Sequence, residues 1–224
     1  MGPEIGAELE EALARVYRRA TDLGLLGPRE SDHVVERSRA YADRLVGLAD
    51  GALVADLGSG AGVPGLVVAV ALPAVAVHFV EISERRCAFL RWAVRELVNA
   101  ASDSGDAGEL VGGLSARGEV VHADAAEAGH DPARREHYDV VVARSFRSPA
   151  VTAETASGLL RVGGRLLVSG TPGDEDRWPT AALTTLGLEV IAVDDDGPLR
   201  LREIAKTAPL APDRPRPVRE ISWG

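Results

Sequence analysis

The segment from residue 56 to residue 65 contains the residues of this sequence that best suit ligand binding. It reads Asp-Leu-Gly-Ser-Gly-Ala-Gly-Val-Pro-Gly, so one carboxylate is followed by a series of closely spaced glycines. Glycine adopts positive φ angles and lets a ligand approach the backbone closely. Apolar residues flank the segment on both sides, and this pattern predicts a strand, a tight turn and a helix. The first N–H groups of such a helix are free to bind a ligand.

Two kinds of cofactor bind to a turn of this type. The glycines at positions 60, 62 and 65 match the dinucleotide fingerprint G-x-G-x-x-G. Asp56 at the strand end would repel a pyrophosphate, whereas a carboxylate suits the sulfonium and ammonium groups of S-adenosylmethionine. We therefore favour S-adenosylmethionine over NAD or FAD. A glycine-rich turn that binds no ligand is the third alternative.

Two further acidic residues follow predicted strands. Glu81 lies 25 residues after Asp56 at the end of the second strand, where a carboxylate can accept hydrogen bonds from both ribose hydroxyls. Asp124 follows the third strand and is expected beside the adenine together with Ala125, the first by hydrogen bonds and the second by packing. The alternative for both acids is a solvated side chain that ends a strand.

Arg144 follows the fourth strand, where we expect the methyl acceptor to lie. Its guanidinium can bind a phosphate, and Phe146 can stack on a base, which contributes ~1–3 kcal/mol. The alternative for Arg144 is a structural ion pair with a nearby carboxylate. Arg144 is the catalytic candidate, and the residues expected at the cofactor are Asp56, Gly58, Ser59, Gly60, Gly62, Gly65, Glu81, Asp124, Ala125 and Arg144.

Alternating strands and helices are expected to position these residues. Apolar spacing predicts helices over 7–23, 31–49, 64–71, 84–99, 149–160 and 175–187. It predicts strands over 52–57, 75–80, 119–122, 138–143, 165–169, 188–193 and 199–205, the last two as an antiparallel hairpin. This order indicates an α/β fold with a doubly wound, mostly parallel, seven-stranded sheet. Such sheets bind ligands beyond the carboxyl ends of their strands.

The remaining segments and the bulk composition limit the function classes. Residues 1–50 are expected to form a helical cap, 99–117 a flexible insertion and 207–224 an extended Pro- and Arg-rich tail. A net charge of −9 excludes a uniformly basic nucleic-acid binder but allows a local basic face. No apolar run approaches the ~20 residues of a membrane span, and the histidines lack ligand spacing. We expect a cytoplasmic monomer without a metal site or membrane contact.

The sequence resembles the GidB/RsmG family of 16S ribosomal RNA guanine-N7 methyltransferases. The resemblance is carried by residues 56–65, by Glu81 and by the helix segment Arg-Arg-Cys-Ala-Phe-Leu at 85–90. Residues 24–30, 143–145 and 213–217 resemble further segments of the family. The resemblance implies a class I, Rossmann-like methyltransferase domain over 51–206. It also implies S-adenosylmethionine as cofactor and 16S ribosomal RNA or the small ribosomal subunit as partner.

Two positions depart from the family pattern. Ser38 stands where the family has the histidine of a Glu-Arg-His run, and Ser169 replaces a lysine after the fifth strand. Three functions therefore stay open at this point. They are methylation of guanine N7, methylation of a small molecule or protein by a paralogue, and cofactor binding without catalysis.

Overall fold

The computed structural model describes residues 4–103, 118–171, 173–195 and 199–223. Its helices are α1 (Ala7–Asp22), α2 (Pro28–Ser31), α3 (Val34–Leu45), α4 (Gly65–Ala71), α5 (Glu84–Asp103), α7 (Ala125–Ala128), α8 (Pro149–Leu159) and α9 (Thr180–Thr185). Two 3-10 turns, η1 (Glu175–Arg177) and η2 (Val218–Glu220), lie near the carboxyl end of the chain. The strands are β1 (Leu53–Leu57), β2 (Ala76–Glu81), β3 (Glu119–His122), β4 (Tyr138–Ala143), β5 (Leu160–Ser169), β6 (Leu188–Asp194) and β7 (Leu201–Lys206).

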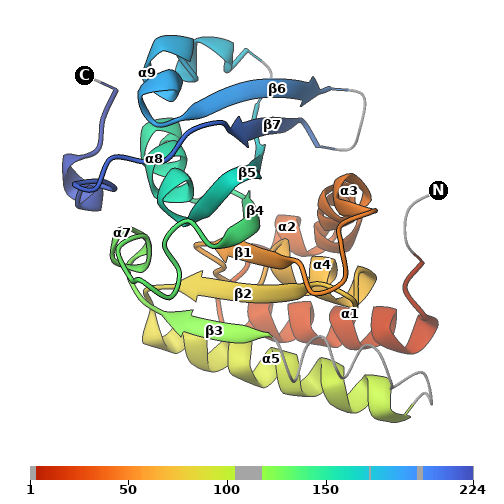
Figure 1. Cartoon of the computed structure of the whole chain (residues 1–224). Coiled ribbons are helices and arrows are strands. Elements are labelled where there is room, and N and C mark those ends of the chain that lie inside the picture. The colour runs from red at the N-terminus through yellow and green to blue at the C-terminus, as the bar shows by residue number, and fades with distance from the viewer. Residues whose placement is uncertain (1–3, 104–117, 172, 196–198, 224) are drawn as a thin grey trace.

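The seven strands form one sheet in the order β3-β2-β1-β4-β5-β7-β6 (Figure 1). The first five strands run parallel, and β7 pairs antiparallel with both β5 and β6. The predicted fold class and the closing hairpin are confirmed. Leu57 pairs with Val80 of β2 and with Ala143 of β4, so these three strands end at the same level. β1 lies where the strand order reverses, which is the usual place of a ligand in such sheets.

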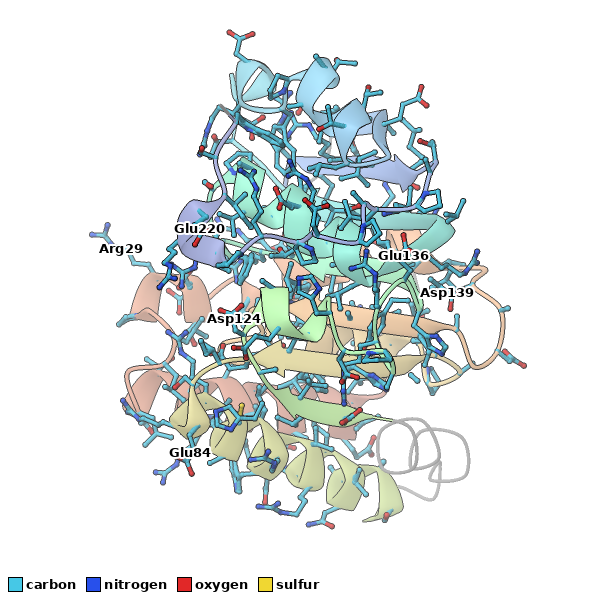
Figure 2. The ribbon with its side chains drawn as sticks, turned by 60° about the vertical axis from the view of Figure 1, so that its left-hand side comes forward. Arg29, Glu84, Asp124, Glu136, Asp139 and Glu220 are labelled. Carbon is cyan, nitrogen blue, oxygen red and sulfur yellow. The ribbon has the colours of Figure 1, made fainter. Side chains whose placement is uncertain are left out.

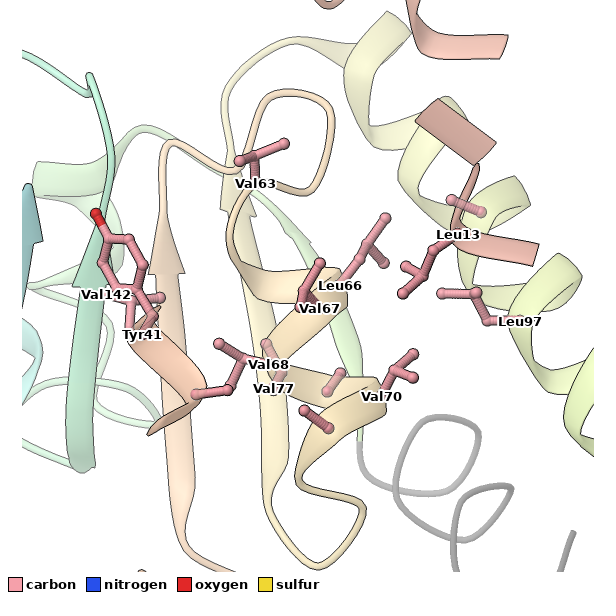
Figure 3. Close-up of a cluster of buried hydrophobic side chains, with 14 of the residues drawn as sticks. Leu13, Tyr41, Val63, Leu66, Val67, Val68, Val70, Val77, Leu97 and Val142 are labelled. Carbon is pink, nitrogen blue, oxygen red and sulfur yellow. The ribbon is translucent and has the colours of Figure 1, made fainter. Parts of the chain in front are cut away.

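Helices cover both faces of the sheet (Figure 1). One apolar core lies under α1, α3, α4 and α5, and the other lies under α7, α8 and α9. Figure 3 shows Val67, Val68 and Val70 of α4 between the sheet and the outer helices, with Leu13 of α1 and Leu97 of α5 on the far side. Every residue of α4 is buried, because α1 and α3 pack against it. The N-terminal helices thus fix the helix that follows the glycine turn.

Several predicted boundaries are wrong. The helix expected over 31–49 is α3 and is shorter, from Val34 to Leu45, and α2 precedes it as an additional short helix; the helix expected over 175–187 is η1 and α9. Pro179 separates the latter two, since proline cannot donate the backbone hydrogen bond that a continuous helix needs. α5 continues to Asp103 because Ala101 is still buried on its inner face. The remainder of the predicted insertion, 104–117, lies outside the described residues.

Two other elements differ from the prediction. β5 begins at Leu160 rather than at residue 165, and its pairing with β4 shifts register between Tyr138 and Val140. Gly163 has a φ of +84°, so the chain bends there in a conformation that glycine tolerates. The short helix α7 has no apolar period to reveal it, since a single turn is too short for one.

In the described ranges, no helix is both long and apolar enough to cross a bilayer.

Candidate functional site

The conformation of the turn after β1 is fixed by backbone hydrogen bonds and by the positive φ angles of its glycines. Gly58, Gly60 and Gly62 have φ angles of +69°, +56° and +79°, a region that other residues rarely adopt. The N–H groups of Gly58 and Ser59 both donate to the carbonyl of Val80, at 2.9 Å and 3.2 Å. The turn after β1 is therefore attached directly to the end of β2.

Glu81 fixes the same junction with its side chain. One oxygen, Oε2, accepts the N–H of Gly60 at 2.9 Å, and Oε1 accepts the N–H of Ser83 at 2.8 Å. The residue is 3% exposed, and Arg86 lies 3.7 Å from Oε2. A carboxylate has about four lone-pair sites. The unused sites of Glu81 can accept hydrogen bonds from ligand hydroxyls while the backbone contacts hold the side chain in place.

Asp56 lies beneath the turn. Its Oδ2 accepts the N–H of Gly65 at 3.3 Å, whereas Oδ1 is buried and has no hydrogen-bond partner among the described residues. Burial raises the pKa of the carboxyl to about 7, although hydrogen bonds from Gly65 and Ser59 oppose this shift. A Cβ atom on Gly65 would lie 2.5 Å from Oδ2, so glycine is required there for packing. The Tyr17 hydroxyl supports the turn by donating to the carbonyl of Gly62 at 3.2 Å.

A cavity of about 330 Å³ opens beside Glu81, and we call it the Glu81 cavity. It is lined by Gly58, Val80, Glu81, Ile82, Arg86, Ala123, Asp124, Ala125, Ser145, Phe146, Arg147 and Val218. Of the predicted cofactor residues, the structure brings four together at this cavity: Gly58, Glu81, Asp124 and Ala125. The other six do not line it: Asp56, Ser59, Gly60, Gly62, Gly65 and Arg144. Their direct contact with a cofactor stays a prediction.

Asp124 has a structural contact of its own in this cavity wall. Its Oδ1 caps α7 by accepting the N–H of Ala126 at 2.8 Å. Sequence reasoning missed the neighbouring Ile82, which is 58% exposed although it is apolar. The available signal was an apolar residue immediately after a strand-ending carboxylate. Val218 gave no such signal, since nothing in the sequence shows that the tail returns to the sheet.

A second cavity, of about 420 Å³, lies on the other side of the segment that follows β4. We call it the Arg144 cavity. It shares Ser145, Phe146 and Arg147 with the Glu81 cavity. The Phe146 ring lies against the turn, because a Cβ atom on Gly58 would be 2.2 Å from its Cδ2. Ser145 has a φ of +50°, a conformation that costs on the order of 1 kcal/mol in a non-glycine residue.

Arg144 is a largely covered cation of the second cavity. Its Nη2 lies 3.0 Å from Oε1 of Glu30, and its side chain is 9% exposed. The ion-pair alternative therefore describes a real contact, and the catalytic role of Arg144 stays a prediction. Three more arginines line the cavity and have no carboxylate partner among the residues that the structure describes: Arg37, Arg147 and Arg177. The Arg144 cavity is thus a local basic site on an acidic protein.

The helical cap supports this segment as well as the glycine turn. The Tyr41 hydroxyl of α3 donates to the carbonyl of Ala143 at 3.0 Å, directly before Arg144. Burial raises the pKa of the Tyr41 hydroxyl, so it remains a hydrogen-bond donor over the physiological pH range. Together with Tyr17, it connects both sides of the site to the N-terminal helices.

Comparison with known proteins identifies the family. A family model described as "GidB: rRNA small subunit methyltransferase G" matches residues 7–102. Ribosomal RNA small subunit methyltransferase G of Mycolicibacterium vanbaalenii is 35% identical over 203 residues, which cover 86% of this chain and 79% of the relative. The chain belongs to the GidB family. The predicted resemblance is confirmed.

Other members of the GidB family match over part of their length. The proteins of the same name from Symbiobacterium thermophilum and Roseiflexus are 34% and 36% identical over 69% and 73% of this chain. The chain spans 58% and 66% of these two relatives. Among solved structures, a Corynebacterium glutamicum protein and a methyltransferase from Geobacter sulfurreducens share the fold, with TM-scores of 0.56 and 0.53 and identities of 18% and 14%. Each comparison covers 87% or more of this chain and 90% of the other.

The two departures from the GidB family pattern lie in different environments. Ser38 is fully buried in α3, where its hydroxyl donates to the carbonyl of Val34 at 2.6 Å. It lines neither cavity. Ser169, in contrast, lines the Arg144 cavity. Only the second departure therefore changes the surface on which an acceptor would lie.

Asp56 predicts a pH dependence of stability. Its pKa is about 7 in the folded protein against 3.8 for the free side chain, so the folded state holds a proton that the unfolded state has lost. This group favours folding below pH 4, and its contribution falls as the pH rises to about 7. In Asp56→Asn the contribution is absent. We expect urea titrations to show that the free energy of unfolding of the variant, measured relative to that of the wild type, rises by on the order of a few kcal/mol between pH 4 and 8. Parallel pH profiles of the two proteins would contradict the raised pKa of Asp56.

Proposed function

We propose that this protein is an S-adenosylmethionine-dependent methyltransferase that modifies N7 of a guanine in 16S ribosomal RNA of the small subunit. The observation that carries the proposal is the pair of cavities that share one wall. The Glu81 cavity presents a carboxylate and a glycine turn, and the Arg144 cavity presents arginines. The names of the GidB relatives support a ribosomal RNA acceptor.

The residues of the Glu81 cavity fit the proposed cofactor. The unused lone pairs of Glu81 suit ribose hydroxyls, and Gly58 lets a ligand approach the backbone. The orphaned Oδ1 of Asp56 lies under the turn and outside both cavities, so when ionised it would attract a cation at the turn only from a distance. Ile82, Asp124 and Ala125 line the cavity where we expect the adenine. A pyrophosphate in this cavity would meet the carboxylates of Glu81 and Asp124, which disfavours NAD.

The cofactor supplies a methyl group on a positively charged sulfur. Guanine N7 has an in-plane lone pair and no proton to lose, so the reaction is an in-line displacement that needs no general base. The protein has to align the two partners, and orientation can lower a barrier by ~7–11 kcal/mol. Phe146 lies at the boundary of the cavities, against Gly58. Transfer of the methyl group across this boundary requires the Phe146 ring to turn away from Gly58. In its new position the ring can stack on the acceptor base.

The arginines of the Arg144 cavity would bind the phosphates next to the acceptor. Arg147 is exposed and lines both cavities, which suits a contact with the nucleotide that carries the reacting base. Phosphate contacts release counterions from RNA, so binding weakens as salt rises.

The decisive experiment incubates the protein with radiolabelled S-adenosylmethionine and unmethylated small ribosomal subunits. We expect label at one guanine, located by nuclease mapping. We also expect Arg147→Gln to reduce the slope of log affinity against log salt by about 1. Arg161→Gln is the matched control, because Arg161 pairs with Asp139 at the opposite end of β4 and lines neither cavity.

Three other outcomes would contradict the proposal or a part of it. Label in a small molecule or protein, with none in the subunits, would identify a paralogue with another acceptor. Cofactor binding without turnover on any substrate would identify a module that has lost catalysis. A flat response of RNA binding to salt would contradict the role of the arginines.

A further inference from the structure

The C-terminal tail is attached to α8 through a buried carboxylate. Glu154 is 1% exposed. Its Oε2 lies 2.7 Å from Nη1 of Arg214 and 2.8 Å from Nη2 of Arg216, and its Oε1 accepts the backbone N–H of Arg216 at 2.7 Å. Burial opposes ionisation, but the hydrogen bonds and charges of the two arginines hold the pKa of Glu154 below its ordinary value. These two tail arginines are therefore engaged within the protein.

Backbone packing holds the same segment against α7 and α8. A Cβ atom on Gly129 or Gly158 would lie 2.8 Å or 2.9 Å from the Pro215 ring, so both glycines make room for it. His130 Nε2 is 2.7 Å from the Pro215 carbonyl. Arg135 donates to the carbonyl of Arg214 at 2.6 Å. The tail is thus fixed by several independent contacts rather than simply extended.

The anchored tail reaches the Glu81 cavity. Val218 lines this cavity together with Asp124 and Ala125, on the side where we expect the adenine. It also lines a larger cavity of about 1000 Å³ beside α7, with Pro215 and Pro217. Figure 2 shows Asp124 at the beginning of α7 and Glu220 in the tail segment above it, and Figure 1 shows the tail passing α7 and α8. Residues almost a hundred positions apart thus form one wall.

We propose that Glu154 is a positioning residue for the cofactor site, because it holds the tail through Arg214 and Arg216 so that Val218 closes the adenine side of the Glu81 cavity. The inference rests on the proposed function, since it requires that this cavity binds the adenosine part of S-adenosylmethionine. Glu154 itself does not line the Glu81 cavity. Its effect on binding must therefore pass through the tail. An apolar wall at this place removes water from one face of the base and strengthens the neighbouring polar contacts.

The test measures the affinity of the full-length protein for S-adenosylhomocysteine by calorimetry. We expect the dissociation constant to rise about tenfold in Glu154→Gln, which keeps the shape of the side chain but loses both charge-assisted ion pairs. Val218→Ser is expected to raise it about fivefold through loss of apolar contact. Val162→Ser is the matched control, because Val162 is 47% exposed in β5 and lines neither cavity.

Two further readouts separate positioning from general stability. Hydrogen exchange should show that S-adenosylhomocysteine protects the tail amides of the wild type and protects them less in Glu154→Gln. With subunits as acceptor, Glu154→Gln should raise the KM for S-adenosylmethionine and leave kcat within twofold. If Glu154→Gln does not fold, the affinity of Val218→Ser decides whether the tail closes the adenine side of the Glu81 cavity. Wild-type binding with unchanged affinity in the folded variants would overturn this inference only. No binding by the wild type would overturn the proposed function and this inference with it.

Discussion

Replacing Glu81 with alanine is expected to weaken the binding of S-adenosylmethionine by about 100-fold or more. Each hydrogen bond to a charged group contributes about 1.5–3 kcal/mol, and two of them to the ribose correspond to at least two powers of ten in affinity. The variant also loses the contacts of Oε2 with Gly60 and of Oε1 with Ser83, so the turn itself is less well fixed. Calorimetry with S-adenosylmethionine measures the effect directly.

Two related variants make this prediction specific. Glu81→Gln keeps one acceptor oxygen and should lie between the wild type and Glu81→Ala in affinity. Glu84→Ala removes an exposed acid three residues further along the chain, outside both cavities (Figure 2). Its affinity should match that of the wild type. An affinity of Glu81→Ala within twofold of the wild type would remove the basis for a cofactor in this cavity.

Gly65→Ala is expected to destabilise the protein by about 1–3 kcal/mol, the usual cost of inserting atoms into a well-packed core. The added Cβ would lie 2.5 Å from Oδ2 of Asp56 and 2.8 Å from the Phe79 ring, and both neighbours are fully buried. Alanine normally favours a helix over glycine by up to ~1 kcal/mol. A net loss would therefore show that steric overlap outweighs helix propensity here. Urea unfolding gives the free energy of unfolding of both proteins.

The matched control for this substitution is Gly6→Ala. Gly6 precedes α1, has a φ of −59°, and a Cβ atom there would have no neighbour closer than 3.9 Å. Because Gly6 is the N-cap of α1, where alanine is less favourable than glycine, the control should lose no more than about 1 kcal/mol of the free energy of unfolding. Equal stability of Gly65→Ala and the wild type would mean that the turn is loosely packed against Asp56.

The sequence predicts the site best where the signal is local. The Asp-Leu-Gly-Ser-Gly turn and Glu81 follow apolar strands, so their place at one edge of a parallel sheet follows from the strand order. The depth of Asp56 could not be predicted in this way. A strand-ending carboxylate can point into a cavity or beneath a turn, and packing against Gly65 selects the second arrangement.

Contacts between distant segments are the part that the sequence does not reveal. The Phe146 ring against Gly58 and Val218 beside Asp124 both depend on where loops return after long connections. The Glu154 anchor is a further case, because a glutamate inside a helix ordinarily indicates a solvated face. Its two arginine partners lie about sixty residues away, beyond any local period.

The hydroxyls of Tyr17 and Tyr41 have a consequence for how this protein can be inactivated. They attach α1 and α3 to the carbonyls of Gly62 and Ala143. Helices α1 and α3 thereby support two loops that are distant from them in the sequence. Random mutations that abolish the proposed methylation in a genetic screen should accordingly be scattered through the N-terminal helices as well as clustered at the cavities, and many of them would change no residue within reach of a substrate.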